Sequence, residues 1–144
     1  MKRILLASVI VSLVAVACGG GAEKKTEPAP VLAQPAPNVA EGEKVYKTYC
    51  IACHMVDGKG IEGLNPPLAG SDWVAGDKTR LINVVLNGLQ GEIEVNGTKY
   101  NGVMASHGFL TNAQIAGVLT YVRSNFGNSA DAVSVAEVNA IRPQ

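Results

Sequence analysis

The chain has 144 residues, with 12 basic and 12 acidic side chains and a formal charge of zero. This length allows one small domain, and the balanced charge gives no electrostatic footprint for nucleic acid, so we expect no nucleic-acid partner. Only 5% of the residues are aromatic, which makes a thin core that a large apolar cofactor would complete.

Residues 1–17 have the pattern of a targeting segment. Two basic residues precede an apolar run over 4–17, which is too short to span a bilayer comfortably. The small residues before Cys18 resemble the processing site of bacterial lipoproteins, with Ala15 where leucine is most typical. The resemblance implies a lipoprotein signal peptide over 1–17 and a lipid on Cys18. An ordinary signal cleavage and an uncleaved anchor are the alternatives.

Residues 18–38 are predicted to form the lipid anchor and a tether. This stretch holds four of the seven prolines and a run of glycines, a composition that cannot build a packed core. We therefore expect an exported protein, anchored by lipid to a bacterial membrane and facing the periplasm or the cell exterior. The folded domain is expected to occupy residues 39–144.

The first predicted helix covers residues 39–50. Asn38 is suited to cap its start, and Glu41 follows three residues later, as in a capping box. Gly42 is unfavourable inside a helix and therefore indicates a close contact with another helix.

Residues 50–54 read C-I-A-C-H, the attachment pattern of a c-type haem. Two thiols one helical turn apart can both form thioethers with the vinyl groups of one macrocycle, and the next histidine can bind the iron from the proximal side. We predict one covalently bound haem c held by Cys50, Cys53 and His54.

Three other uses of this motif are a dithiol redox pair, a disulfide and half of a zinc site. A thioredoxin-like pair should begin a helix within a βαβ pattern, which is not visible around residues 50–54. A zinc site needs four ligands, and beyond the motif the sequence offers only Cys18 and His107.

A glycine- and proline-rich loop follows over residues 55–70. A loop of this length in a small domain is expected to wrap a bound group. Asp77 predicts the start of a helix that runs to about residue 86 and ends at Gly88. We expect Trp73, just before it, in the core or in the wall of the cofactor pocket.

A β-hairpin is predicted over residues 93–100. An Asn-Gly pair lies there between two short alternating runs, which is the strongest local hairpin signal. With a two-residue turn, Glu94 lies opposite Lys99 and Ile93 lies opposite Tyr100, and both cross-strand pairs are favourable.

Met104 is the candidate for the second axial ligand of the iron. It is the only methionine beyond the motif loop, since Met55 adjoins His54 and cannot reach the opposite face of a haem. A lone methionine is more often a core residue, but an electron-transfer haem needs a distal ligand from a distant part of the chain. His107 is the rival ligand.

The last main helix is predicted over residues 111–126. Thr111 and Gln114 fit a capping box, and apolar residues follow at helical spacing up to Gly127. Ser134 with Glu137 predicts a short final helix to about residue 141, whose role the sequence does not reveal.

Together these residues resemble a class I mono-haem cytochrome c domain over residues 39–128, in a lipoprotein form. The resemblance implies a mostly α cytochrome c fold wrapped around one covalent haem, with one short β-hairpin insertion. It also implies that Gly42 and Tyr46 of the first helix meet Tyr121 of the last. By register to the following leucine, Pro66 matches the proline whose carbonyl accepts a hydrogen bond from the proximal histidine.

The hairpin and the residues up to Met104 look closer to one subgroup of small bacterial cytochrome c domains. Members of that subgroup also occur fused to oxidase subunit II or to copper nitrite reductase. They usually have proline directly after the ligand methionine, where this chain has Ala105.

The resemblance implies an electron carrier and not an enzyme. The expected function is to carry single electrons between respiratory-chain partners, with a quinol-oxidising complex as donor and a terminal oxidase or reductase as acceptor. The alternative is a haem peroxidase or gas-binding haem protein with a labile distal ligand. A haem-based sensor or a purely structural lipoprotein is a third reading.

Overall fold

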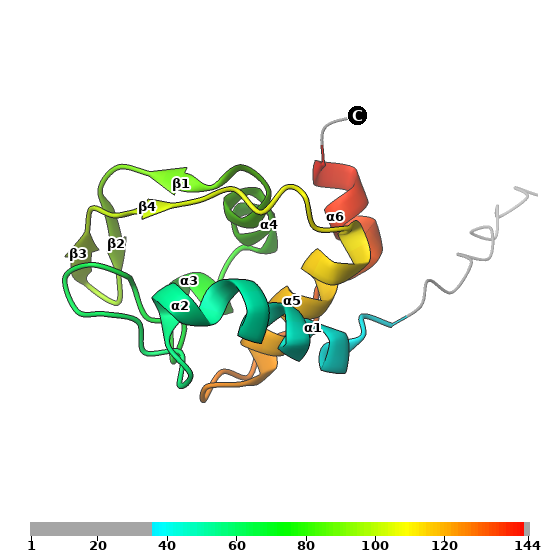
Figure 1. Cartoon of the computed structure of the whole chain (residues 1–144), viewed down its shortest axis with the longest axis horizontal. Helices are drawn as coiled ribbons and strands as arrows, with labels where there is room; N and C mark the ends of the chain where they lie inside the picture. Colours follow the sequence, from blue (N-terminus) through cyan, green and yellow to red (C-terminus); the bar gives the residue numbers. More distant parts are fainter. Residues whose placement is uncertain (1–35, 143–144) are drawn as a thin grey trace, which may run out of the picture. The chain divides into compact units, whose positions relative to one another are not determined.

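The computed structural model describes residues 36–142, so the predicted signal peptide, Cys18 and most of the predicted tether lie outside the described residues. Figure 1 shows the elements in chain order: α1 (Val39–Val45), the π-helical turn η1 (Tyr46–Cys50), α2 (Ile51–His54), α3 (Asp72–Ala75), α4 (Lys78–Asn87), β1 (Leu89–Gln90), β2 (Ile93–Val95), β3 (Thr98–Tyr100), β4 (Val103–Met104), α5 (Asn112–Ser124) and α6 (Val135–Ile141). The predicted mostly α fold with one short hairpin is confirmed. None of the helices in 36–142 is long and apolar enough to cross a membrane.

The first helix begins where the sequence predicts. The side chain of Asn38 accepts a hydrogen bond from the backbone N–H of Glu41 at 3.1 Å. The helix is not uniformly α, however, because the N–H of Ile51 donates to the carbonyl of Tyr46, five residues back. Such π turns are frequent at functional sites. The spacing of apolar residues in the sequence does not predict the π turn, because that spacing is helical on both sides of it.

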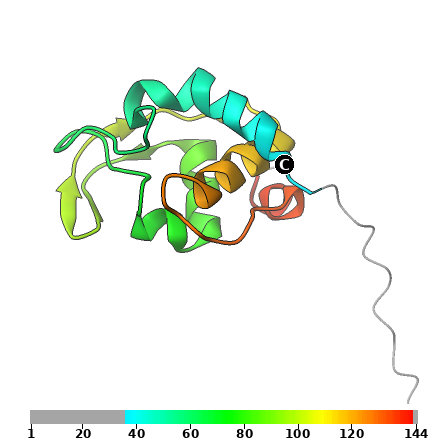
Figure 2. The ribbon, with the colours of Figure 1, turned by 90° about the horizontal axis from the view of Figure 1, so that it is seen from below.

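α1 crosses α5 at a contact between two glycines, and Figures 1 and 2 show the two helices side by side. A Cβ atom on Gly42 would lie 2.1 Å from the carbonyl oxygen of Gly117, so no larger residue fits. Beside this crossing, the ring of Tyr46 packs on those of Tyr121 and Phe126, with centroids 5.6 and 5.1 Å away. The predicted contact is therefore present, with Gly117 as an additional partner.

The hairpin has the predicted register. Ile93 pairs with Tyr100 and Glu94 with Lys99. Lys99 forms its ion pair with Glu92, at 2.8 Å, and not with Glu94, which lies directly opposite. Glu92 is two residues before Glu94 in the chain.

A second pair of strands, β1 and β4, is not predicted by the sequence. Leu89 pairs with Met104 and Gln90 with Val103, in antiparallel orientation. Each strand has two residues, which is too short for an alternating pattern to be recognised. This pairing fixes the backbone of Met104 beside the end of α4.

α5 begins at the predicted capping box of Thr111 and Gln114. It ends at Ser124, two residues earlier than predicted, because Asn125 leaves the helix and its amide donates to the carbonyl of Tyr121 at 2.8 Å. Phe126 and Gly127 then adopt positive φ values. The predicted final helix is also present as α6, with its Ser134–Glu137 capping box.

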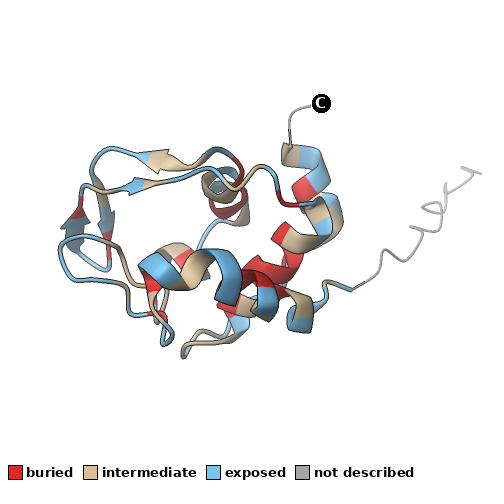
Figure 3. Cartoon of the chain, in the orientation of Figure 1, coloured by how far each residue is buried: buried red, intermediate tan, exposed pale blue. Residues whose placement is uncertain are grey.

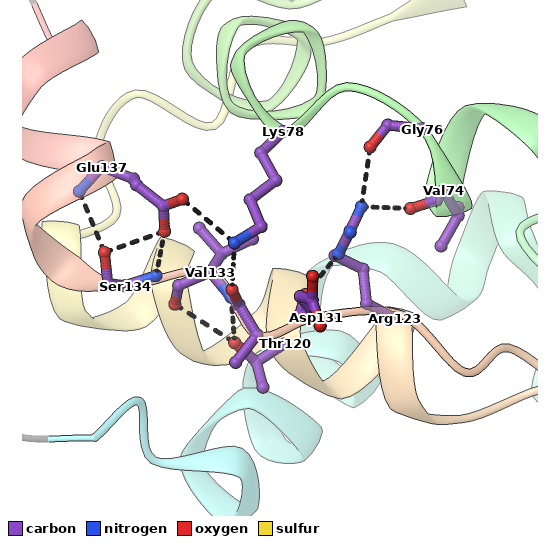
Figure 4. Close-up of polar contacts among 10 residues, drawn as sticks. Val74, Gly76, Lys78, Thr120, Arg123, Asp131, Val133, Ser134 and Glu137 are labelled. Atoms are coloured by element: carbon purple, nitrogen blue, oxygen red, sulfur yellow. Dashed lines mark hydrogen bonds and ion pairs between the residues drawn. The ribbon is translucent and has the colours of Figure 1, made fainter.

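A buried arginine holds the segment between α5 and α6 in place. Arg123 is 3% exposed, and its guanidinium donates to the carbonyls of Val74, Gly76 and Asp131 (Figure 4). Burying a charged group requires such hydrogen bonds. Beside it, Lys78 bonds to the carbonyl of Ala132 and forms an ion pair with α6.

The buried residues of Figure 3 concentrate on α5 and on the sides of α1 and α4 that face it. The fully buried side chains come from distant parts of the chain: Tyr46, Ile82, Ile115, Val133 and Val138. The helices thus make a core at one side of the domain, while the strands and the loop after α2 enclose a second region.

Candidate cofactor site

A cavity of about 320 Å³ lies in that second region. Its lining comes from η1, α2, α3, α4, α5 and all four strands, together with the loops that join them, and most of it is apolar. Trp73 belongs to the wall, as predicted. A large apolar space of this kind suits a flat hydrophobic cofactor, which supplies the contacts that the few aromatic residues do not.

The structure brings all five predicted haem-site residues within 36–142 to this cavity: Cys50, Cys53, His54, Pro66 and Met104. His54 lies on α2 and Met104 on β4, two elements that Figure 1 shows apart from each other, with α2 lower and β4 higher in the view. The remaining predicted site residue, Cys18, lies outside the described residues.

The two cysteines lie at the edge of the cavity. Cys50 is half-buried, Cys53 is exposed, and no disulfide joins them. Burial, with a smaller contribution from Cys53, raises the pKa of the Cys50 thiol to about 11. A dithiol oxidoreductase needs a lowered thiol pKa, so this environment argues against a redox-active pair.

His54 is held in one orientation by the loop that follows it. It is 8% exposed, and its Nδ1 lies 3.1 Å from the carbonyl oxygen of Pro66. Burial lowers the pKa of His54, against the opposing effect of the Pro66 hydrogen bond. The imidazole is therefore neutral near pH 7, with Nδ1 as the donor. This leaves the lone pair of Nε2 available to a metal ion in the cavity.

The backbone around residues 58–68 keeps the Pro66 carbonyl in place. Leu68 donates its N–H to the carbonyl of Gly58 at 2.7 Å. A Cβ atom on Gly60, whose φ is +67°, would lie 2.7 Å from the Pro66 oxygen. The phenol of Tyr46 donates to the Met55 carbonyl at 2.6 Å, which fixes the end of α2. The glycines of this loop thus allow the chain to pass close beneath the histidine.

Met104 is positioned by its backbone. It pairs with Leu89 across the β1–β4 ladder. A Cβ atom on Gly88, whose φ is +79°, would lie 2.5 Å from the Met104 carbonyl oxygen, so only glycine permits this approach. The half-buried thioether side chain lines the cavity. A soft sulfur donor there suits iron.

The rival ligand, His107, lines the same cavity. Its backbone N–H donates to the Val85 carbonyl at 2.8 Å, and its ring packs near those of Tyr49 and Phe109. The Nδ1 atom of His107 is buried and has no hydrogen-bond partner among the described residues. A buried nitrogen without a hydrogen-bond partner is costly, so this ring is less well satisfied than that of His54.

A zinc site does not fit these residues. Within 36–142, no group of three or more histidine, cysteine, aspartate or glutamate side chains is close enough to hold a metal ion. The donors that line the cavity also include a thioether on β4, a ligand that occurs on haem iron and not in structural zinc sites. The cavity therefore fits a haem better than any of the alternatives.

Comparisons with known proteins agree with this geometry. The family model described as cytochrome c matches residues 39–126. Over 94 residues the chain is 46% identical to cytochrome c-552 of Thermus thermophilus, a match that covers 62% of this chain and 71% of that relative. A second cytochrome c-552 of the same species is also 46% identical, and there the match covers 63% of the relative.

Larger proteins match over a smaller share of their length. The cytochrome c subunit of the alcohol dehydrogenase (quinone) of Gluconobacter oxydans is 36% identical over 106 residues, which cover 70% of this chain and 22% of that subunit. A cbb3-type cytochrome c oxidase subunit of Azospirillum is 33% identical over 103 residues, which cover 69% of this chain and 34% of the subunit.

Proposed function

The chain belongs to the cytochrome c family, and from this premise we propose that it is a membrane-tethered c-type cytochrome that passes single electrons between respiratory-chain partners. Membership of the family confirms the predicted cofactor, one covalently bound haem c, and an electron-carrying role. The membrane tether and the identity of the partners go beyond what membership of the family implies, and they are our proposal.

One observation carries the proposal: His54 and Met104, from the separate elements α2 and β4, line the same apolar cavity. Cys50 and Cys53 would hold the haem by thioethers, with His54 and Met104 as its two axial ligands. The bound haem supplies an iron that changes between the ferrous and ferric states, and methionine–histidine ligation raises its potential. The apolar lining excludes water, and the Pro66 carbonyl keeps His54 in the orientation and tautomer that a metal ligand needs.

The exposed apolar side chains suggest where partners dock. Tyr49, Leu64 and Val103 line the cavity, as does the exposed Cys53, and their own exposed fractions are 44%, 55% and 73%. Phe109, 65% exposed, packs against Tyr49 with ring centroids 5.2 Å apart. We assign partner docking to this edge, because electron transfer needs close approach to the cofactor and apolar groups there favour transient contact.

The partners that we propose are a quinol-oxidising complex as donor and a terminal oxidase or reductase as acceptor. Support comes from the names of the relatives, which include subunits of a quinone-linked alcohol dehydrogenase and of a cbb3-type oxidase. Because this chain spans only 22% and 34% of those two subunits, their activities are not transferred to it.

The second candidate function is a haem peroxidase or gas-binding protein with a labile distal ligand. The observation that favours it is a second histidine, His107, among the residues that line the cavity. Voltammetry and ligand binding on the purified protein distinguish the two. For a carrier we expect a reversible one-electron wave and no carbon monoxide complex of the ferrous protein within the mixing time. Rapid formation of that complex in the wild type would favour the second candidate.

The proposed anchor predicts a change of location without a change at the haem. Cys18→Ser should convert a membrane-bound protein into a soluble one, because lipid chains contribute about 0.8 kcal/mol per buried CH₂ and two or more hold a protein firmly. Fractionation of cells after salt and carbonate washes measures the effect, and the visible spectrum serves as the control. If the variant still sediments with membranes, another element anchors the protein.

A further inference from the structure

Residues 105–111 join Met104 to α5, and we call them the distal loop. Phe109 of this loop packs on Tyr49, Leu110 is buried in the core, and hydrogen bonds tie the loop to the domain at two places. The first is the end of α4: the hydroxyl of Ser106 donates to the carbonyl of Leu86, and the N–H of His107 donates to the carbonyl of Val85. These contacts lie within three residues of Met104 and hold the near end of the loop.

The second attachment is made by a single side chain, Arg142, directly after α6. Its guanidinium donates to the carbonyl of Gly108 at 2.8 Å, to the carbonyl of Leu110 at 2.5 Å and to the side-chain oxygen of Asn112. The planar fork of an arginine suits such a set of acceptors, and bonds from a charged donor are stronger than neutral ones. Arg142 therefore supplies the hydrogen bonds that tie the far end of the loop to the residue after α6.

α6 is fixed to the domain without help from that loop. Val138 on α6 is fully buried. At the start of the helix Ser134 is the N-cap and forms a capping box with Glu137, which also forms an ion pair with Lys78 at 3.0 Å (Figure 4). Lys78 also donates to the carbonyl of Ala132 at 2.6 Å. The helix is thus a rigid base from which Arg142 reaches the loop, and it lies beyond residues 39–126, which match the cytochrome c model.

We propose that Arg142 is a positioning residue for the distal side of the haem site: through Gly108 and Leu110 it holds the loop closed and keeps Met104 on the iron. The inference rests on the proposed function, in which Met104 is the distal ligand. Without Arg142, two carbonyls and the Asn112 amide lose their charged partner, and the loop opens more often while α6 and the remaining core stay packed. External ligands then reach the iron during these openings.

The test uses full-length, haem-loaded protein with three variants at this position and one control. Arg142→Met and Arg142→Gln remove the charge, whereas Arg142→Lys keeps it but offers a point donor in place of the fork. Lys78→Met is the matched control, because it removes a charged contact to the other end of α6 and touches no residue of the loop. Stopped-flow mixing of the ferrous protein with carbon monoxide measures loop opening, and Tm measures global stability.

We expect Arg142→Met and Arg142→Gln to raise the rate of carbon monoxide binding by about tenfold or more, with Arg142→Lys between them and the wild type. The long-wavelength absorption band of the ferric methionine-ligated haem should be lost at a lower temperature. Lys78→Met should lower Tm while leaving the carbon monoxide rate within about twofold of the wild type, because it weakens α6 only away from the loop.

Two results would overturn this inference while leaving the proposed function intact. One is an Arg142→Met protein that excludes carbon monoxide as well as the wild type does. The other is an equal rise of the rate in Arg142→Met and Lys78→Met, which would show that α6 acts only through global stability. If the wild type itself binds carbon monoxide rapidly, the proposed function fails first and this inference fails with it.

Discussion

Replacing both Cys50 and Cys53 by serine is expected to leave an exported chain that is largely unfolded. Without thioethers the haem is no longer retained, and the domain must close around an empty apolar cavity. At about 24 cal/mol per Å³, a cavity of about 320 Å³ costs about 8 kcal/mol. That is as large as the whole stability of an ordinary small domain, about 5–15 kcal/mol.

The measurement is a far-UV circular dichroism melt of the purified double variant beside the wild type. We expect little helical signal and no cooperative transition. Cys18→Ser is the matched control, because it also removes a thiol but lies outside the folded domain predicted from the sequence. A cooperative, native-like melt of the haem-free double variant would show that the helices fold without the cofactor.

The second large effect is expected for Met104→Ala, a variant whose properties distinguish an electron carrier from a haem enzyme. Alanine cannot reach the iron, so the long-wavelength ferric band should vanish and carbon monoxide and peroxide should bind. The potential should fall by on the order of a hundred millivolts, since axial ligands set haem potentials over a range of about 0.8 V. Visible spectroscopy and a redox titration measure both effects.

His107→Ala is the control for this variant, because His107 lines the same cavity and belongs to the same loop. It should keep the ferric band and the potential close to those of the wild type. If the wild type has no such band while His107→Ala changes the spectrum, the axial pair is two histidines. Such a result would exchange the assigned roles of Met104 and His107.

The features that follow from neighbouring residues could be predicted from the sequence. The caps at Asn38, Thr111 and Ser134 each join a side chain to a backbone N–H three residues away, and the turn of the hairpin lies within two residues. The cysteines and His54 are likewise adjacent in sequence, so their placement on one helical segment needed no knowledge of the fold.

The features that depend on distant partners could not be predicted in this way. Gly117 appears in the sequence as an ordinary helix glycine, and only the approach of α1 gives it a role. Arg123 and Arg142 bond mainly to backbone carbonyls of distant segments, which leave no trace in the sequence pattern. Pro66 could be placed only through the resemblance to a known family, whereas Met104 stands out in the sequence because it is the only methionine beyond the motif loop.

The contact between Gly42 and Gly117 also bears on how chains of this kind can vary in length. It joins the two ends of the domain and closes one long chain segment that contains the motif, the hairpin and Met104. The entropy of closing a loop grows only with the logarithm of its length, by about 0.6 kcal/mol for each doubling. Extra residues can therefore be gained between the two helices at small thermodynamic cost, and the short β2–β3 hairpin lies within this segment. Neither glycine can be replaced in this way, because a Cβ atom on Gly42 would lie 2.1 Å from the carbonyl oxygen of Gly117. We therefore expect related chains to differ in the length of this segment while they keep the two glycines at its ends.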